Sequence, residues 1–156
     1  MAELKTNAMR ILDTNKINYM VHTYEPGDSI DGISVSKKIG KSVDEVYKTL
    51  VTKGKDDYFV FVIPVSEELN LKKAAKAVEE KAIEMIHVKD INKVTGYIRG
   101  GCSPIGMKKH YKTVINETAI LLDTFVVSAG KIGFQVELNP EELSQLINAE
   151  FEDIIM

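Results

Sequence analysis

The sequence predicts a single α/β domain in which helices surround a mixed, curved β-sheet, rather than a doubly wound parallel sheet. The chain has 156 residues, of which 44% are hydrophobic, and this is enough for one domain with a substantial core. Segments with helical spacing of apolar residues interleave with many short segments of strand character. Because no repeat or low-complexity linker interrupts the chain, we expect residues 1–156 to form one domain.

The first half of the chain is predicted to contain two helices, three strands and two turns. Apolar residues recur at helical spacing before Asn15. Gly40 stands where a helix C-terminal cap is expected, and a Pro-Gly pair favours the first turn. In order, the elements are a helix from Leu4 to near Asn15, a strand at 19–24, a turn at 25–28, a helix at 34–39, a strand at 46–52, a hairpin at 53–57 and a strand at 58–64.

The second half is predicted to continue with short helices and strands. Asn70 can cap a helix, and Asn139 followed by proline and two glutamates is a strong helix start, because the acids face the positive end of the helix dipole. In order, the elements are a helix at 71–79, a strand at 83–88, a helical turn at 90–94, extended segments at 112–115 and 124–128, a turn at 130–133, a strand at 134–138 and a last helix that carries Leu143, Leu146 and Ile147 on one side.

The composition argues against several classes of protein. A net charge of -3 and a pI near 5.7 give no global field that attracts nucleic acid, although lysines cluster near residues 37–41, 72–76 and 108–112. No apolar run approaches the roughly 20 residues that span a bilayer, and the first residues lack an apolar signal core. A single cysteine, Cys102, excludes an internal disulfide. We therefore expect a cytoplasmic protein without membrane contact.

A glycine-rich segment at 95–109 contains four glycines and a proline within eleven residues, so it cannot be a regular helix or a central strand. Its glycine spacing approaches that of a P-loop, but Met107 stands where that motif requires lysine. Two interpretations remain. The segment is a structural turn, or the amides of Gly100, Gly101 and Gly106 are free to donate to an oxyanion or a phosphate.

Lys48 is a candidate site residue because of its place in a strand. Alternation puts it on the same face as Val46 and Leu50, where a lysine seldom lies unless it is paired or functional. Alternatively, the strand lies at an edge and the lysine stem reaches water. Tyr24 ends a strand just before a turn, where side chains often line a site, but other strand tyrosines fit this pattern equally well.

Cysteine and histidine do not form a recognisable motif. Cys102 and three scattered histidines lack the spacing of a thiol enzyme, and a closed zinc site needs four ligands. The favoured role for Cys102 is that of a small buried hydrophobic residue. We expect neither a metal nor a cofactor.

Eight short segments follow one another with consistent spacing over nearly the whole chain. They are Val-His-Thr-Tyr at 21–24, Val-Tyr-Lys-Thr-Leu at 46–50, Leu-Asn-Leu-Lys-Lys-Ala-Ala at 69–75, Thr-Gly-Tyr at 95–97, Gly-Gly-Cys-Ser-Pro-Ile-Gly at 100–106, Lys-Thr-Val-Ile-Asn at 112–116, Val-Ser-Ala-Gly-Lys-Ile-Gly at 127–133 and Ala-Glu-Phe at 149–151. Together they resemble the YbaK-type Cys-tRNA(Pro) deacylases, free-standing relatives of the editing domain inserted in some bacterial prolyl-tRNA synthetases. The resemblance implies the fold of that insertion, with a barrel-like sheet.

The resemblance implies a trans-editing enzyme. Prolyl-tRNA synthetase mischarges its tRNA with cysteine, which is close to proline in size, and a pocket cannot strongly reject a near-isostere. Family members remove the cysteine ester from the 3′ end of Cys-tRNA(Pro), and Cys-tRNA(Cys) is a further expected substrate. The substrate thiol attacks its own ester carbonyl and a thiolactone leaves. Such an enzyme needs amides and a cation rather than a nucleophile or a metal.

The resemblance also implies the residues of the site. The family motifs place catalytic roles on Lys48, Tyr24 and Gly101. They place substrate binding on a larger set of residues, namely Thr49, Gly100, Ser103, Pro104, Gly106, Ser128 and Gly130. Lys48 would contact a phosphate, the ester carbonyl or a protein carboxylate. Cys102 occupies the variable position of its motif and receives no role, and Ala129 stands where many relatives have glycine.

Two other functions stay open from the sequence. A deacylase for tRNA mischarged with alanine or serine would use the same loop but would require a water nucleophile. A non-catalytic module would bind aminoacyl-tRNA or a synthetase without turnover. The expected partners are the aminoacylated 3′ end of a mischarged tRNA and prolyl-tRNA synthetase, in a ternary complex that selects the tRNA.

Overall fold

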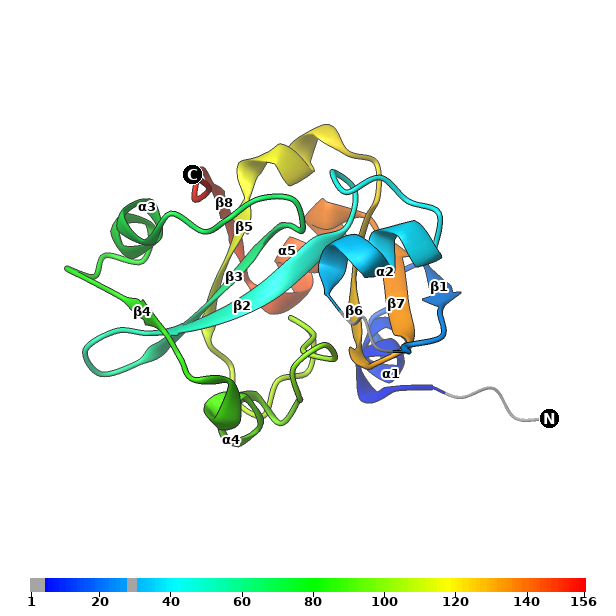
Figure 1. Cartoon of the computed structure of the whole chain (residues 1–156), viewed down its shortest axis with the longest axis horizontal. Coiled ribbons are helices and arrows are strands. Elements are labelled where there is room, and N and C mark those ends of the chain that lie inside the picture. Colours follow the sequence, from blue (N-terminus) through cyan, green and yellow to red (C-terminus); the bar gives the residue numbers. More distant parts are fainter. Residues whose placement is uncertain (1–4, 28–30) are drawn as a thin grey trace.

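Five α-helices and two β-sheets are formed by residues 5–27 and 31–156, which are the residues that the computed structural model describes (Figure 1). The α/β class predicted from the sequence is confirmed. The helices are α1 (Asn7–Thr14), α2 (Gly32–Lys38), α3 (Leu71–Ala77), α4 (Ile91–Thr95) and α5 (Pro140–Ile147), with 3₁₀ segments η1 (Val88–Asp90) and η2 (Glu117–Leu121). The strands are β1 (Tyr19–Thr23), β2 (Tyr47–Lys53), β3 (Tyr58–Pro64), β4 (Glu84–Met85), β5 (Lys112–Asn116), β6 (Phe125–Lys131), β7 (Phe134–Leu138) and β8 (Glu150–Glu152).

The larger sheet has the strand order β4-β2-β3-β5-β8 and is mixed, as predicted. Strand β2 runs antiparallel to β3 and β4, whereas β5 runs parallel to β3 and β8. The smaller sheet is antiparallel with the order β1-β7-β6. Figure 1 shows the two sheets beside each other, with β2 running from their junction to the hairpin at its far end.

The single barrel-like sheet expected from the resemblance is replaced by two sheets that do not close within the described residues. One parallel bridge joins them, between Val46 and Val126. The same edge of β2 pairs with β4 only at Thr52 and Lys53. Between these two contacts, that edge of β2 has no strand partner in the part of the chain that the structure describes. A cleft can therefore open beside the middle of β2.

Local chemistry explains where the helices begin and end. The side chain of Asn70 accepts hydrogen bonds from two amides of α3, and that of Asn139 accepts from the amide of Glu142, so both predicted caps are confirmed. Gly40 follows α2 at φ +73° and donates its amide to a carbonyl of that helix, as expected of a C-terminal cap. Helix α3 ends two residues earlier than predicted, and Glu79 adopts a left-handed φ of +60°.

Several element boundaries differ from the prediction. The strand predicted at 83–88 is confined to β4, and the chain then turns through η1 into α4, where the helical turn is confirmed. Strand β6 continues to Lys131 through an irregularity after Ser128. The segments β8 and η2 were not predicted, because β8 is defined by long-range pairing with β5. Leu4 and Asp28, at ends of the predicted first helix and turn, lie outside the described residues.

The core packs on both faces of the larger sheet. Phe61 and Ile63 of β3 join α3 in one apolar cluster, whereas Val62 on the other face joins α1, α5 and the smaller sheet in a second. All three of these β3 side chains are fully buried, and β3 is the central strand of the larger sheet, beside β2. None of the helices in the described ranges is long and apolar enough to cross a membrane.

Candidate functional site

A cleft of about 390 Å³ lies at the junction of the two sheets. Its walls come from β2, from α2 and the residue before it, from the glycine-rich segment and from the facing strands β6 and β7. The lining residues are Asp31, Gly32, Ile33, Val35, Val46, Tyr47, Lys48, Thr49, Leu50, Val65, Arg99, Gly100, Cys102, Ser128 and Gln135. Four of the predicted site residues are therefore brought together from three separate segments: Lys48, Thr49, Gly100 and Ser128.

Lys48 is a partly buried cation in the wall of the cleft. Burial lowers the pKa of Lys48 below its ordinary value, and the carboxylates of Glu68 and Glu67 only partly oppose this. Partial burial removes part of the hydration of the side chain, which disfavours its charged form. A partly dehydrated cation gains more than an exposed one from an anionic oxygen placed beside it.

Thr49 brings an unsatisfied hydroxyl to the same wall. Its Oγ1 atom is buried and has no hydrogen-bond partner among the described residues. Leaving such a group unpaired costs roughly 1–3 kcal/mol, so buried hydroxyls usually have partners. Across the cleft, Ser128 Oγ accepts a hydrogen bond from the Gly130 amide at 3.2 Å.

The glycine-rich segment contributes backbone amides to the cleft, but not all of the amides that the sequence suggested. Gly101 donates its N–H to the carbonyl of Ile98 at 3.0 Å, so its amide is not free, contrary to expectation. Gly100, at φ +85°, occupies the left-handed position of this turn. Within residues 5–27 and 31–156, the amides of Gly100 and Cys102 make no hydrogen bond. Since both residues line the cleft, these two amides can serve a ligand.

Gly101 and Gly130 allow the glycine-rich segment to dock on the turn between β6 and β7. A Cβ atom on Gly101 would lie 3.1 Å from the backbone nitrogen of Ile132. A Cβ atom on Gly130 would lie 2.9 Å from the ring of Tyr97, and Gly130 has φ +95°. Both glycines therefore permit close packing, which positions the neighbouring cleft residues.

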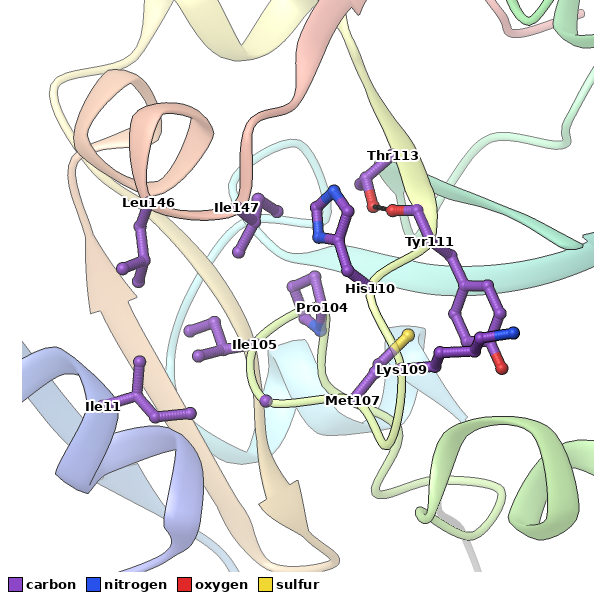
Figure 2. Close-up of a pocket in the computed structure, with 11 residues that line it drawn as sticks. Ile11, Pro104, Ile105, Met107, Lys109, His110, Tyr111, Thr113, Leu146 and Ile147 are labelled. Atoms are coloured by element: carbon purple, nitrogen blue, oxygen red, sulfur yellow. Dashed lines mark hydrogen bonds between the residues drawn. The ribbon is translucent and has the colours of Figure 1, made fainter.

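Three other predicted site residues belong to the glycine-rich segment but do not line the cleft. Ser103 is fully buried, and its hydroxyl accepts the amide of Ile105 at 3.1 Å. Pro104 and Gly106 line a separate cavity of about 220 Å³. Figure 2 shows Pro104 and Ile105 in this cavity, between α1, which contributes Ile11, and the end of α5. In the structure these residues therefore pack the glycine-rich segment against its neighbours, away from the cleft.

Tyr24 is not among the residues that line the cleft. It follows β1, where its amide donates to Gly133 at 3.0 Å and the ammonium group of Lys38 lies 5.7 Å from its ring centroid. Its hydroxyl is buried and finds no hydrogen-bond partner in the described part of the chain. The catalytic role of Tyr24 stays a prediction.

Several residues of the cleft were not singled out from the sequence. Gln135 of β7 is only 5% exposed and stands opposite Ser128 in the antiparallel ladder. In the sequence, a polar residue between Phe134 and Val136 could have marked it as a candidate. No sequence pattern marked Arg99, because it reaches the cleft through the turn from Ile98 to Gly101. Burial raises the pKa of Cys102 to about 11, so its thiol stays protonated near neutral pH.

The described residues contain no group of three or more His, Cys, Asp or Glu side chains that could hold a metal ion. The polar features of the cleft are two cationic side chains, Lys48 and Arg99, together with hydroxyls, amides and the carboxylate of Asp31. This combination can hold a polar, uncharged group beside Lys48, or an anionic one.

Comparison with known proteins adds three findings. The family model described as the aminoacyl-tRNA editing domain matches residues 29–146. A protein of Enterococcus faecalis that carries the provisional name Cys-tRNA(Pro)/Cys-tRNA(Cys) deacylase EbsC is 46% identical over 152 residues, which are 96% of this chain and 93% of that protein. A proline--tRNA ligase of Fervidobacterium nodosum is 29% identical over 98 residues, 63% of this chain and 17% of the ligase.

Solved structures agree on the fold. A crystal structure described as a candidate trans-editing enzyme for prolyl-tRNA synthetase superposes with a TM-score of 0.83 at 20% identity, over 99% of both chains. A second solved protein, described as hypothetical, gives a TM-score of 0.86 at 17% identity, over 94% of this chain and 97% of the other. At such low identity these matches support the arrangement of helices and strands alone.

Proposed function

The chain belongs to the aminoacyl-tRNA editing domain family, and from this premise we propose that it is a deacylase that removes cysteine from mischarged Cys-tRNA(Pro) and from Cys-tRNA(Cys). Residues 1–156 then act as one editing domain. The family expected from the eight sequence motifs is confirmed. Support for the substrate comes from the name of the relative that is 46% identical.

The observation that carries the proposal is the position of Lys48 in a cleft that is also lined by Gly100 and Cys102, whose amides are unpaired within the described residues. The ester of an aminoacylated tRNA has an uncharged carbonyl that becomes an oxyanion when a nucleophile attacks. A partly dehydrated ammonium group stabilises that oxyanion more strongly than it stabilises the carbonyl. The amides are suited to hold the terminal ribose and phosphate.

The substrate itself brings the nucleophile in this proposal. The cysteine thiol loses its proton to water, and the sulfur forms a bond to the ester carbonyl carbon. The bond from that carbon to the ribose oxygen then breaks, and the ribose oxygen takes up a proton. The products are a cysteine thiolactone and a tRNA with a free hydroxyl. Because attack is intramolecular, the cleft only has to hold the reacting atoms in place.

The remaining predicted residues have supporting roles in this scheme. We assign substrate contacts to Thr49, Gly100 and Ser128, because these line the cleft. Five other residues shape the loop or its contact surface, namely Gly101, Ser103, Pro104, Gly106 and Gly130. We further propose a cytoplasmic location and a ternary complex with prolyl-tRNA synthetase, in which the synthetase selects the tRNA. The net charge of -3 supports this, since it gives the chain little affinity of its own for tRNA.

Single-turnover deacylation tests the proposal. Wild type, Lys48→Met and a control, Lys53→Met at the exposed end of the same strand, are assayed with Cys-tRNA(Pro) and Cys-tRNA(Cys). We expect the wild type to cleave both, Lys48→Met to be slower by about 100-fold and Lys53→Met to match the wild type. Equal rates for Lys48→Met and wild type would reject the role of Lys48.

Serine and alanine esters of tRNA(Pro) separate the alternatives. Cleavage of the serine ester as fast as the cysteine ester would reject the substrate-thiol mechanism and favour a water nucleophile. Binding of aminoacyl-tRNA without any turnover by the wild type would reject the deacylase and favour a non-catalytic module.

A further inference from the structure

Arg99 lines the cleft and was assigned no role by the sequence motifs. It is exposed, and its side chain makes no hydrogen bond or ion pair with any described residue. The chain contains 20 basic residues but only two arginines, Arg10 and Arg99. A guanidinium group presents a planar pair of donors that matches a phosphate, which a lysine does not.

The backbone beside Arg99 has further features that suit an anion. The turn from Ile98 to Gly101 is closed by the Gly101 amide, which donates to the Ile98 carbonyl at 3.0 Å. Gly100 takes the left-handed conformation at φ +85°, and the amides of Gly100 and Cys102 are unpaired in the described residues. The two free amides stand on either side of the bonded amide of Gly101, and backbone N–H groups beside a left-handed residue can form a concave site that favours anions. An exposed cation and backbone donors therefore belong to the same short segment.

The two cations of the cleft differ in hydration. Lys48 is partly buried with a lowered pKa, whereas Arg99 is exposed. The third charged residue of the lining, Asp31, caps α2, because its carboxylate accepts hydrogen bonds from the amide and hydroxyl of Ser34. A phosphodiester keeps its charge and is costly to bury, so it remains near solvent. An uncharged ester can enter more deeply and reach Lys48.

We propose that Arg99 binds a phosphodiester of the tRNA 3′ end at the mouth of the cleft, together with the amides of Gly100 and Cys102. This contact leaves Lys48 to act on the ester carbonyl rather than on a phosphate. The inference rests on the proposed deacylase function and deepens it, because it separates the group that holds the nucleic acid from the group that acts on the ester.

The test compares a substrate that has phosphates with one that has none. Wild type, Arg99→Gln, Arg99→Lys and the control Arg10→Gln are assayed with Cys-tRNA(Pro) and with 3′-O-cysteinyl-adenosine. For Arg99→Gln, we expect the ratio of kcat/KM for the tRNA to kcat/KM for the nucleoside ester to fall about tenfold, mainly through KM for the tRNA. Arg10 is exposed on α1 and does not line the cleft, so Arg10→Gln should keep the wild-type ratio.

Salt dependence gives a second readout that a structural role would not change. Neutralising one phosphate of a single strand contributes about 0.7 to the slope of log affinity against log salt. The slope of log kcat/KM for the tRNA should therefore become shallower by about 0.7 in Arg99→Gln and stay near the wild-type value in Arg99→Lys.

The outcomes distinguish failure of this inference from failure of the proposed function. An inactive wild type would reject the deacylase itself. An active wild type with an unchanged substrate ratio and salt slope in Arg99→Gln would overturn the phosphate contact alone. An equal loss on both substrates would also overturn it, since Arg99 would then act on the adenosine or on the shape of the loop.

Discussion

Replacement of Glu137 by glutamine is expected to destabilise the domain strongly at neutral pH and not at all in strong acid. Glu137 of β7 accepts hydrogen bonds from His22 of β1 at 2.7 Å, Lys41 at 3.2 Å and Thr124 at 2.5 Å, and its side chain is only 12% exposed. Lys41 follows α2, and α2 forms one wall of the cleft. The carboxylate thus connects that wall to the smaller sheet.

The size of the effect follows from the pKa of Glu137. Burial alone would raise this pKa, but hydrogen bonds from Thr124, His22 and Lys41 outweigh it and lower the pKa from 4.5 to about 2. At roughly 1.4 kcal/mol per pKa unit, the carboxylate contributes about 3 kcal/mol to the free energy of unfolding. Because the folded pKa is the lower one, this contribution is complete above pH 4.5 and is lost as the pH falls towards 2.

Urea unfolding between pH 2 and pH 7 measures this difference. At pH 7 Glu137→Gln should have a free energy of unfolding about 3 kcal/mol below wild type and a melting temperature lower by about 6–12 °C. The two proteins should converge near pH 2. The control is Glu152→Gln, at an exposed residue of β8 whose side chain makes no hydrogen bond within the described ranges. A constant gap between wild type and Glu137→Gln at every pH would refute the argument, because the lost stability would not then depend on the charge.

Three further outcomes test the site and its supports. Burial lowers the pKa of Lys48, so kcat/KM should decline in alkali with a midpoint below about 10.4. Lys48→Arg should lack this decline, and an identical decline in Lys48→Arg would contradict the assignment to Lys48. Because the pKa of Cys102 is raised to about 11, labelling by iodoacetamide should accelerate about tenfold per pH unit from pH 7 to 10, whereas a plateau near pH 8.5 would contradict the raised pKa. Gly130→Ala should lower the free energy of unfolding by about 1 kcal/mol more than Gly40→Ala, since both glycines have positive φ but only Gly130 meets a neighbour, the Tyr97 ring at 2.9 Å; equal losses in urea unfolding would show that the ring moves away freely.

Much of the fold could be predicted from local patterns. The caps at Asn70 and Asn139, the hairpin between β2 and β3 and the turn residue Gly40 all formed as expected, because each depends on the chemistry of a few neighbouring residues. Strand β8 could not be found in this way. It has three residues, two of them glutamates, and exists because Phe151 pairs with Ile115 of β5.

The candidate site likewise contains residues that the sequence nominated and residues that only the structure revealed. The strand position of Lys48 and the motif around Gly100 were sufficient to nominate both residues, and both line the cleft. The motif does not show which glycine amides are free. In the structure the Gly101 amide donates to the Ile98 carbonyl, and the lack of a side chain lets Gly101 pack closely against the β6–β7 turn. Arg99 lines the cleft because the turn from Ile98 to Gly101 places it there.

The sequence by itself determined the family and the α/β class, and it nominated Lys48, since these depend on ordered motifs and on local backbone preferences. The tertiary structure alone decided that two sheets meet at Val46 and Val126, and that the unpaired edge of β2 opens a cleft there. It also decided that Gln135 and Arg99 line that cleft. The physical reason is that strand pairing, burial and unpaired polar groups are set by contacts between residues far apart in the chain, which local sequence patterns do not specify.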